Sequence, residues 1–228
     1  MNQNRELYPL VSVDIALFSV IDEALKVLLV QRAQEPEVKR WALPGGLLKP
    51  QLDVSLEATA RRVLADKVAV DLPHLEEVGT YSGPDRDQRG WSVTVLFYAL
   101  LPLDKIDALV RNKVEAVKWA EATAVGHSLA FDHAEQLAAA VQKLRAKVVA
   151  DVLPLHLLPE RFTLTQLQRV VEVISGQTLD KSSFRRRLKA SKDLVQLDEF
   201  VGGAQRPAQL FRASEIFIFK WSRHQVRS

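Results

Sequence analysis

Hydrophobic residues alternate with small or polar ones near the start of the chain, which predicts a β-strand over Val11–Leu17. The apolar run Val27–Val30 follows across a short acidic turn at Asp22 and Glu23, so the two segments predict a hairpin. Farther along, the pattern predicts a turn and then three more strands: Leu43–Gly46, followed by Val78–Tyr81, Trp91–Leu101 and Val114–Trp119.

Two stretches with helical spacing lie among these strands. From Ser55, a residue typical of a helix N-cap, apolar positions recur as far as Val68. A longer helix is expected from His133 to about Ala150, because this stretch is rich in strong helix formers. Strands and helices mixed in this way predict an α/β or α+β domain, arranged as a layered α/β/α sandwich.

The C-terminal part of the chain has a different pattern. Residues 152–159 carry two prolines and several leucines, which indicates an apolar linker that packs between two domains. Two helices and two strands are expected after it: one helix capped by Thr163 and ended by Gly176, one from Asp180 or Ser182 through Lys189, and the strands Leu194–Phe200 and Ala208–Ala213. This layout is that of a winged helix-turn-helix, so we expect domains of residues 1–151 and 152–228.

The two parts also differ in charge. The whole chain has 31 basic and 28 acidic side chains, a net charge of +3, but residues 1–151 carry −3 and residues 152–228 carry +6. An acidic body with a smaller basic domain is a pattern expected when one part binds nucleic acid. A solvated basic surface without a partner explains the charge equally well.

Composition narrows the class of protein. Hydrophobic residues make up 47% and charged residues 26% of the chain, which is ordinary for a globular protein. There is no cysteine, which excludes disulfides, a thiolate metal site and a cysteine nucleophile. The longest apolar runs are too short to span a membrane, and the first residues lack the apolar core of a signal peptide. We therefore expect a soluble, cytoplasmic protein.

A first candidate motif is Trp41-Ala42-Leu43-Pro44-Gly45-Gly46, followed by the helix that carries Arg62. This combination resembles the Nudix family, whose box runs from a glycine to a helix with the pattern Arg-Glu-apolar-x-Glu-Glu-x-Gly-apolar. When Arg62 is set on the arginine of the box, Leu64 and Val70 match its apolar positions.

The glutamates of the box are missing from this sequence. Val63, Asp66 and Lys67 stand in their places, Ala69 replaces the glycine, and the earlier glutamate falls on Val54, beside Asp53. Nudix hydrolysis of a diphosphate needs carboxylates that hold Mg²⁺ and activate water, and this set cannot build that cluster. The resemblance therefore implies a Nudix fold without the hydrolase chemistry, in which Lys67 meets a ligand phosphate instead of a metal.

A second motif, Asp85-Arg86-Asp87-Gln88-Arg89-Gly90-Trp91, is similar to the Arg-Asp-x-Arg-Gly segment of Nudix proteins that act on ADP-ribose. Two guanidiniums on one loop suit a diphosphate, because each can bind two oxygens at once. Trp91 either offers a stacking face for a base or packs into the core. A charged loop alone is commonly just solvated, but together with Gly45 and Gly46 it favours an ADP-ribose-like ligand.

A third motif lies on the second helix of the basic domain, where Arg185, Arg186 and Arg187 are consecutive. Because each residue turns a helix by ~100°, the three spread over roughly 200°. Such a helix can contact phosphates on both sides of a groove and direct one arginine at guanine. With Gln205 and Arg206 at the expected wing tip, this pattern favours DNA recognition over an ordinary basic surface.

The whole arrangement resembles one family. A degenerate Nudix domain, Phe131-Asp132-His133, an apolar linker and the basic helix together look like the Nudix-related transcriptional regulators, the NrtR family, over about Leu10 to Phe211. The resemblance implies a bacterial homodimeric repressor of NAD-metabolism genes, with no required cofactor and no enzymatic activity. Such a repressor binds double-stranded operator DNA through its winged helix. It releases the DNA when ADP-ribose, or a related nucleoside diphosphate sugar, binds the Nudix domain.

The motifs and the resemblance together select the candidate site residues. Those expected to bind the ligand are Trp41, Gly45, Gly46, Arg62, Lys67, Arg86, Arg89 and Trp91. Those expected to bind DNA are Lys181, Ser183, Arg185, Arg186, Arg187, Gln205 and Arg206. No catalytic residue is expected, and the five histidines show no metal-ligand spacing, so no metal ligand is expected either.

Two other classes of protein stay open at the level of the sequence. One is an active ADP-ribose pyrophosphatase with an accessory nucleic-acid-binding domain, which would require a carboxylate triad in the box. The other is an adaptor whose basic domain binds another protein, which a gel shift with DNA would separate from a regulator.

Overall fold

The structure is a computed structural model and describes residues 8–68, 74–105, 116–150, 154–202 and 207–215. These residues form two compact units that are not contiguous in the sequence. The first unit holds the described residues up to 18, from 26 to 99 and from 116 to 142. The second holds residues 19–25, 100–105 and the described residues from 143 onward.

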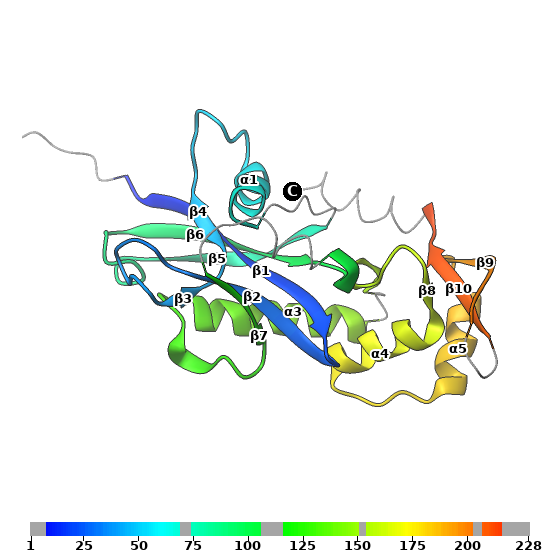
Figure 1. Cartoon of the computed structure of the whole chain (residues 1–228). Helices are drawn as coiled ribbons and strands as arrows, with labels where there is room; N and C mark the ends of the chain where they lie inside the picture. The colour runs from blue at the N-terminus through cyan, green and yellow to red at the C-terminus, as the bar shows by residue number, and fades with distance from the viewer. Residues whose placement is uncertain (1–7, 69–73, 106–115, 151–153, 203–206, 216–228) are drawn as a thin grey trace, which may run out of the picture. The chain divides into compact units, whose positions relative to one another are not determined.

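A seven-stranded sheet is the centre of the first unit (Figure 1). Strands β1 (Leu10–Ile21) and β2 (Ala24–Gln31) form the expected hairpin and are neighbours in the order β3–β2–β1–β6–β5. Asp22 and Glu23 at its turn both have positive φ, 50° and 59°, as a two-residue turn of type I′ requires. The buried middle of β1 and β2 provides much of the apolar core.

The other strands of this sheet are β3 (Trp41–Ala42), β4 (Gly45–Leu47), β5 (Leu75–Gly83), β6 (Ser92–Leu100) and β7 (Val117–Glu121). Strand β4 pairs antiparallel with β1, and β7 pairs antiparallel with β2. The predicted turn over Leu43–Gly46 is therefore wrong for the two glycines, which lie in β4. Long-range pairing with β1, rather than the local turn preference of glycine, decides their conformation.

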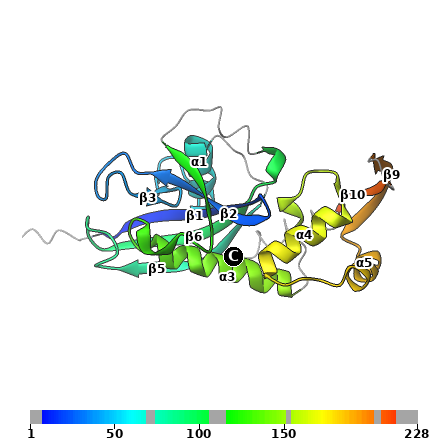
Figure 2. The same cartoon turned by 60° about the horizontal axis from the view of Figure 1, so that its bottom comes forward.

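Two helices cover this sheet. Helix α1 (Leu56–Val68) and helix α3 (His133–Val149) lie on its opposite faces (Figures 1 and 2), which gives the expected α/β/α sandwich. Oγ of Ser55 accepts the N–H of Ala58 at 3.1 Å, so α1 begins at the predicted cap. Short 3₁₀ turns at η1 (Leu103–Lys105) and η2 (Gly126–Ser128) belong to the connections.

The second unit has the expected winged-helix layout. After the 3₁₀ turn η3 (Leu155–Leu157), it contains β8 (Phe162–Thr163), α4 (Leu164–Ser175), α5 (Lys181–Ala190), β9 (Leu194–Val201) and β10 (Ala208–Ala213). The strands form an antiparallel sheet in the order β8–β10–β9. Strand β8 was not predicted, because two residues are too few to show a periodic pattern.

The caps of α4 and α5 fix the two helices at the predicted places. Thr163 and Gln166 form a reciprocal capping box at the start of α4, and Gly176 ends it in the left-handed conformation, with φ of 70°. Oδ1 of Asp180 accepts the N–H of Ser183 at 2.8 Å, so α5 begins after Asp180.

The core of the second unit is apolar. Helix α5 buries Phe184 and Leu188, and α4 buries Leu167, Val170, Val171 and Ile174. Within the proposed linker, Leu155, Leu157 and Leu158 are buried. Among the residues that the structure describes, no helix is long and apolar enough to cross a membrane.

Candidate functional site

A cavity of about 460 Å³ lies in the first unit. Its walls come from β1, β4, α1, the loops that follow β2 and β5, and the start of α3. Six of the predicted ligand residues line it: Gly45, Gly46, Arg62, Lys67, Arg86 and Arg89. Segments that are far apart in the sequence therefore meet at one place.

Two predicted ligand residues do not line this cavity. Trp41 lies beside a smaller cavity of about 250 Å³, where Nζ of Lys118 is 4.1 Å from the centroid of its ring. The Trp91 side chain is half exposed, and its backbone carbonyl accepts the N–H of Leu10. The structure thus separates both tryptophans from the other predicted residues.

Packing explains why the motif contains two glycines. A Cβ on Gly45 would lie 2.2 Å from Oδ1 of Asp14, and a Cβ on Gly46 would lie 2.8 Å from Cγ2 of Val63. Strand β4 therefore passes directly against a buried carboxylate of β1 and against helix α1. Only residues without a side chain fit at these two positions.

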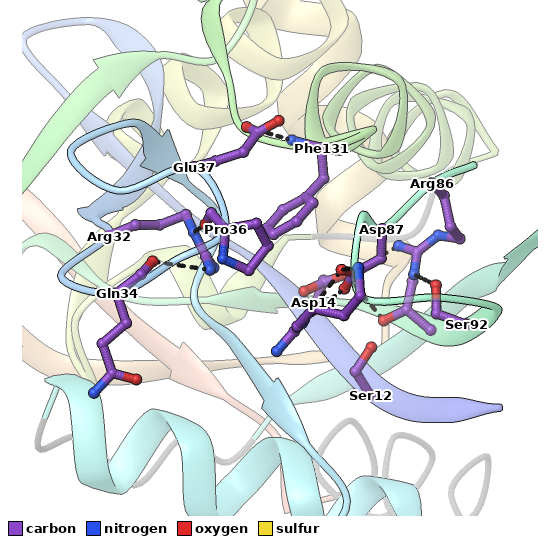
Figure 3. A network of polar contacts seen from close by, with 12 residues as sticks. Ser12, Asp14, Arg32, Gln34, Pro36, Glu37, Arg86, Asp87, Ser92 and Phe131 are labelled. Atoms are coloured by element: carbon purple, nitrogen blue, oxygen red, sulfur yellow. Dashed lines mark hydrogen bonds and ion pairs between the residues drawn. The ribbon is translucent and has the colours of Figure 1, made fainter. Parts of the chain in front are cut away.

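Arg86 is held inside a buried polar network (Figure 3). Its Nε and Nη2 donate to Oδ2 and Oδ1 of Asp132 at 2.9 and 3.0 Å, and its Nη1 donates to Oγ of Ser92 at 3.0 Å. Its Nη2 also lies 3.8 Å from Oδ2 of Asp14. The side chain is only 10% exposed, so Arg86 forms part of the cavity wall and pairs with the start of α3.

The carboxylate of Asp14 belongs to the wall of the cavity. It accepts hydrogen bonds from Oγ1 of Thr94 at 2.9 Å and Nε2 of Gln136 at 3.2 Å, and Nε2 of His133 lies 3.5 Å away. Burial alone would raise the pKa of Asp14, but His133 and these donors together hold it below its ordinary value. Asp14 is therefore ionised at neutral pH despite being buried.

His133 is oriented by the backbone of the first motif. The N–H of Leu43 donates to Nδ1 of His133 at 2.9 Å, so Nδ1 is an acceptor and Nε2 is the ring nitrogen that faces Asp14. These two contacts tie the start of α3 to the first motif and to β1.

Arg89 and Asp87 form a pair on the loop after β5. Nη2 of Arg89 donates to Oδ2 of Asp87 at 2.6 Å, and 42% of the Arg89 side chain is exposed. Burial would raise the pKa of Asp87, but the hydrogen bonds from Arg89 outweigh it and lower that pKa. In contrast to Arg86, Arg89 is accessible to a ligand.

Arg62 braces the loop before α1. It donates to both oxygens of Asp53 at 2.7 Å and to the carbonyl of Leu47 at 3.0 Å. The Arg62 hydrogen bonds hold the pKa of Asp53 far below its usual range. Asp53 also accepts the hydroxyl of Thr59 and the N–H of Lys49, so it is fully occupied.

The positions of the box glutamates do not form a carboxylate cluster. Val63 is buried against Gly46, and the Asp66 side chain is 62% exposed and lies 3.7 Å from Arg62. Across the described residues, no group of three His, Cys, Asp or Glu side chains is placed to hold a metal ion.

The cavity has an excess of positive charge. Its lining contains six cationic side chains, Arg32, Lys49, Arg62, Lys67, Arg86 and Arg89, against four carboxylates, Asp14, Glu35, Asp66 and Asp87. Within the described part of the chain, three of the cations have no ion-pair partner: Arg32, Lys49 and Lys67. Sequence reasoning missed Arg32, Lys49 and Asp14, although an acid in the middle of an apolar strand was a visible signal for Asp14.

The second unit exposes the basic helix. On α5, Lys181, Ser183, Arg186 and Arg187 are exposed, whereas Arg185 is half-buried and its Nη2 lies 3.5 Å from Oγ1 of Thr165. At ~100° per residue, Arg186 lies directly opposite the buried side formed by Phe184 and Leu188. The basic side chains therefore surround the face that points away from the core.

The wing begins beside this helix. A cavity of about 660 Å³ is lined by Lys181 and Arg185 of α5, the first residues of α4, and Phe200, Gln209 and Phe211 of β9 and β10. The predicted wing-tip residues Gln205 and Arg206 lie outside the described residues.

Two family models match successive parts of the chain. Residues 11–144 match the family model of the NUDIX domain, and residues 154–213 match the NrtR DNA-binding winged helix domain. The chain is 40% identical over 205 residues to the ADPR responsive transcriptional repressor NtrR of Acinetobacter baylyi, with 90% of this chain and 82% of that protein covered. It is 32% identical over 130 residues to an ADP-ribose pyrophosphatase of Methanocaldococcus jannaschii, which covers 56% of this chain and 70% of that one.

Solved structures extend this likeness. Shewanella oneidensis NrtR complexed with a 27mer DNA superposes with a TM-score of 0.82 at 37% identity, covering 92% of this chain and 95% of that chain. The NUDIX domain of the same protein complexed with ADP ribose gives a TM-score of 0.55 at 39% identity, covering 63% and 94%. The resemblance and the fold class inferred from the sequence are confirmed: this chain belongs to the NrtR family, with a Nudix domain followed by a winged-helix domain.

Proposed function

We propose that this chain represses NAD-metabolism genes by binding operator DNA through its winged helix, and that ADP-ribose in the Nudix cavity releases it. The observation that carries this proposal is a cavity with six cations and four carboxylates, three of the cations being unpaired within the described part of the chain. The names of its relatives support it: one is an ADPR responsive repressor, and another is known in complex with DNA and with ADP ribose.

The charge of the cavity fits the proposed effector. A diphosphate bridging two sugars carries two negative charges at neutral pH, which matches the excess of two cations in the lining. Lys49 and Lys67 would meet the phosphates, and Arg89 is exposed enough to join them. A related nucleoside diphosphate sugar would satisfy the same charges.

We infer that the Nudix domain has no hydrolase activity. Lys67 occupies a position where the box has a metal-binding glutamate, Val63 is apolar, and Arg62 already engages Asp53. Hydrolysis that depends on Mg²⁺ would need carboxylates free to hold the metal. ADP-ribose should therefore survive incubation with Mg²⁺, and turnover of roughly 1 s⁻¹ or more would favour the pyrophosphatase alternative.

The DNA-binding surface is proposed to centre on α5. Arg186 points away from the core, where it can reach base edges, and Lys181, Ser183, Arg185 and Arg187 flank it along the phosphates. Gln205 and Arg206 would add contacts from the wing.

Salt dependence tests this surface. Replacing a residue that contacts phosphate by Ala should make the slope of log operator affinity against log salt concentration shallower by about one unit. Replacing a base-reading residue should instead cost about 1–3 kcal/mol of binding free energy and relax the preference at one base pair. If the charges at all basic positions of this surface could be removed without loss of operator affinity, the winged helix would not be the DNA-binding element.

The assembly follows from the same proposal. A ligand-binding domain of residues 1–151 and a DNA-binding domain of residues 152–228, in a two-fold homodimer, would present two recognition helices to two half-sites. Such a regulator acts in the cytoplasm, where its operator is.

One experiment decides between this function and its alternatives. Calorimetry measures ADP-ribose binding to the full chain, first alone and then with a duplex from upstream of its own coding sequence. A repressor should bind ADP-ribose without cleaving it, and less tightly when the duplex is present. An enzyme would consume the ligand, and an adaptor would not bind the duplex.

A further inference from the structure

Phe131 has a backbone conformation that is uncommon for an aromatic residue. Its φ of 53° lies in the left-handed region, where a bulky side chain is strained unless its surroundings hold it. The N–H of Phe131 donates to Oε2 of Glu37 at 3.1 Å, and the N–H of Ala130 donates to the carbonyl of Trp41 at 2.8 Å. Glu37 is itself paired with Arg40 at 3.0 Å. The segment after β2 therefore fixes Phe131 at the wall of the cavity.

The guanidinium of Arg32 lies against the ring of Phe131. Cζ of Arg32 lies 4.6 Å from the centroid of the ring. Nε of Arg32 donates to the carbonyl of Pro36 at 2.8 Å and Nη2 to that of Gln34 at 3.4 Å, as Figure 3 shows beside Phe131. The guanidinium thus has a fixed orientation without a carboxylate partner in the described part of the chain.

The part of the cavity wall formed by Arg32 and Phe131 can accept a group of the ligand. Arg32 and Phe131 both line the cavity, and Arg89 lies close enough to matter electrostatically. Burial first, and repulsion from Arg89 second, lower the pKa of Arg32. An electron-rich or anionic ligand group between the two arginines would relieve that repulsion.

We propose that Arg32 and Phe131 form the base-recognition end of the cavity, where the planar ring of a nucleoside diphosphate stacks. The inference rests on the proposed function and adds which part of the ligand goes where. Guanidinium and phenyl faces both stack on nucleobases, and the remaining N–H groups of Arg32 can donate to acceptors at the edge of the base. Lys49 and Lys67, which have no ion-pair partner among the described residues, are left for the diphosphate.

The Phe131 ring has the Arg32 guanidinium 4.6 Å and the centroid of the His133 ring 5.4 Å from its own centroid. Glycine or asparagine at position 131 would adopt the same backbone more easily, but would present no flat face to the cavity. Strain of this kind collects at ligand clamps, where the binding function outweighs the local cost. The fixed ring and guanidinium are arranged before the ligand arrives, which reduces the ordering that binding requires.

Three probes separate the base from the phosphates. Calorimetry on the full chain compares ADP-ribose, ADP and inorganic pyrophosphate, of which only pyrophosphate lacks a base. Phe131→Ala should weaken the binding of ADP-ribose and ADP by about 10-fold or more and leave the binding of pyrophosphate unchanged. Phe131→Leu, which keeps the volume but loses the π-face, should behave like Phe131→Ala, and Phe131→Tyr should bind like the wild type.

A second variant keeps the test informative if Phe131→Ala does not fold. Arg32→Lys retains the charge but loses the planar face, so it should weaken the binding of ADP-ribose and ADP more than that of pyrophosphate. Phe200→Ala, which removes an exposed aromatic side chain of β9 in the other unit, is the control and should bind all three probes normally. Thermal unfolding of each variant verifies that it is folded.

The outcomes distinguish the two proposals. An equal loss of affinity for all three probes in Phe131→Ala would overturn the stacking site while the proposed function stands. Wild-type affinity for ADP-ribose in both Phe131→Leu and Arg32→Lys would do the same. A wild-type chain that bound pyrophosphate but neither nucleotide would overturn both.

Discussion

At Gly45, strand β4 passes so close to β1 that a Cβ would meet the Asp14 carboxylate at 2.2 Å and the carbonyl of Val13 at 2.9 Å. Neither neighbour moves freely, because Asp14 is buried and accepts hydrogen bonds from Thr94 and Gln136. The glycine is therefore required by packing in the wall of the cavity.

This packing predicts the effect of one methyl group. Gly45→Ala should destabilise the fold by about 1–3 kcal/mol, as overpacking of a well-packed core commonly does. Gly79→Ala in β5 is the matched control, because a Cβ there has nothing within 4 Å and the two variants add the same atoms. Denaturant unfolding measures both, and equal midpoints for Gly45→Ala and the wild type would show that the strands can move apart.

The two arginines of the second motif look equivalent in the sequence but are not in the structure. Arg86 is 10% exposed and paired with Asp132 through two hydrogen bonds, whereas Arg89 is 42% exposed and pairs with Asp87 on its own loop. Which carboxylate an arginine meets depends on the start of α3, and no local pattern around residues 85–91 reveals it.

Removal of these arginines should therefore have different consequences. Arg86→Ala removes the cation that pairs with Asp132, to which only Gln136 still donates among the described side chains, and leaves Asp14 with one cation fewer. Losing one partner of a buried ion pair costs about 3–5 kcal/mol. Arg89→Ala breaks a partly exposed pair and should change the free energy of unfolding by less than 1 kcal/mol or so. Urea unfolding of both variants checks this, and a stable Arg86→Ala protein would contradict the buried network.

Among the elements, those that carry their own end signals are the ones that the sequence predicts well. Ser55, Thr163, Gly176 and Asp180 each mark a helix end by a local hydrogen bond or a left-handed residue, and all four do so in the structure. Strands β4 and β8 have only three and two residues and exist because partners distant in sequence pair with them, at Asp14 and Phe211 among others.

In the candidate site, too, the residues that the sequence predicts are those marked by a local motif. The motifs placed six residues at the cavity because they stand on the predicted helix and loops around it. The sequence did not point to Arg32 or Lys49, and it gave Phe131 only as part of the family resemblance, because only the folded chain brings the loop after β2, the loop before α1 and the start of α3 together. Trp41 was selected for its neighbours in sequence, but β3 turns it toward Lys118 and Leu129.

The cap of α5 predicts how this helix responds to acid. Hydrogen bonds from Ser182 and then Ser183 lower the pKa of Asp180 from 3.8 to about 2. Because the pKa is lower in the folded state, the cap stabilises α5 at a pH above the unfolded value. This stabilisation is lost as the pH falls through about 2.

Asp180→Asn keeps a capping oxygen but removes the charge, so α5 should lose its dependence on pH between about 4 and 2. Asp180→Ala should fray the first turn at every pH. The amide NMR signals of Ser183 and Phe184 report on this turn in all three proteins. If the wild type and Asp180→Asn showed the same pH dependence, another carboxylate would control the start of α5.

At the scale of the whole molecule, the ligand cavity and the basic helix belong to different units, so the proposed regulation needs a coupling between them. The first part of helix α3 belongs to the first unit and its last part to the second. Just before the helix, Asp132 pairs with Arg86, and near its end Arg145 donates to the carbonyl of Ile174 in α4 at 3.0 Å. The segment 152–159 and, in the proposed homodimer, a contact between the two subunits would be further routes. Whatever the route, linkage requires that DNA weaken ADP-ribose binding by the same factor as ADP-ribose weakens DNA binding.

We therefore predict that ADP-ribose lowers operator affinity by about 5- to 150-fold, the usual range of such couplings. Arg89→Ala should abolish this response and still bind the operator, since Arg89 is accessible in the cavity and distant in sequence from α5. Arg86→Ala is the poorer probe, because its loss of stability would reduce DNA binding as well. The measurement is an operator titration at several ADP-ribose concentrations for the wild type and Arg89→Ala. Identical wild-type curves with and without the ligand would remove ADP-ribose as the effector, and an Arg89→Ala protein that no longer bound DNA would show that this loop supports the fold.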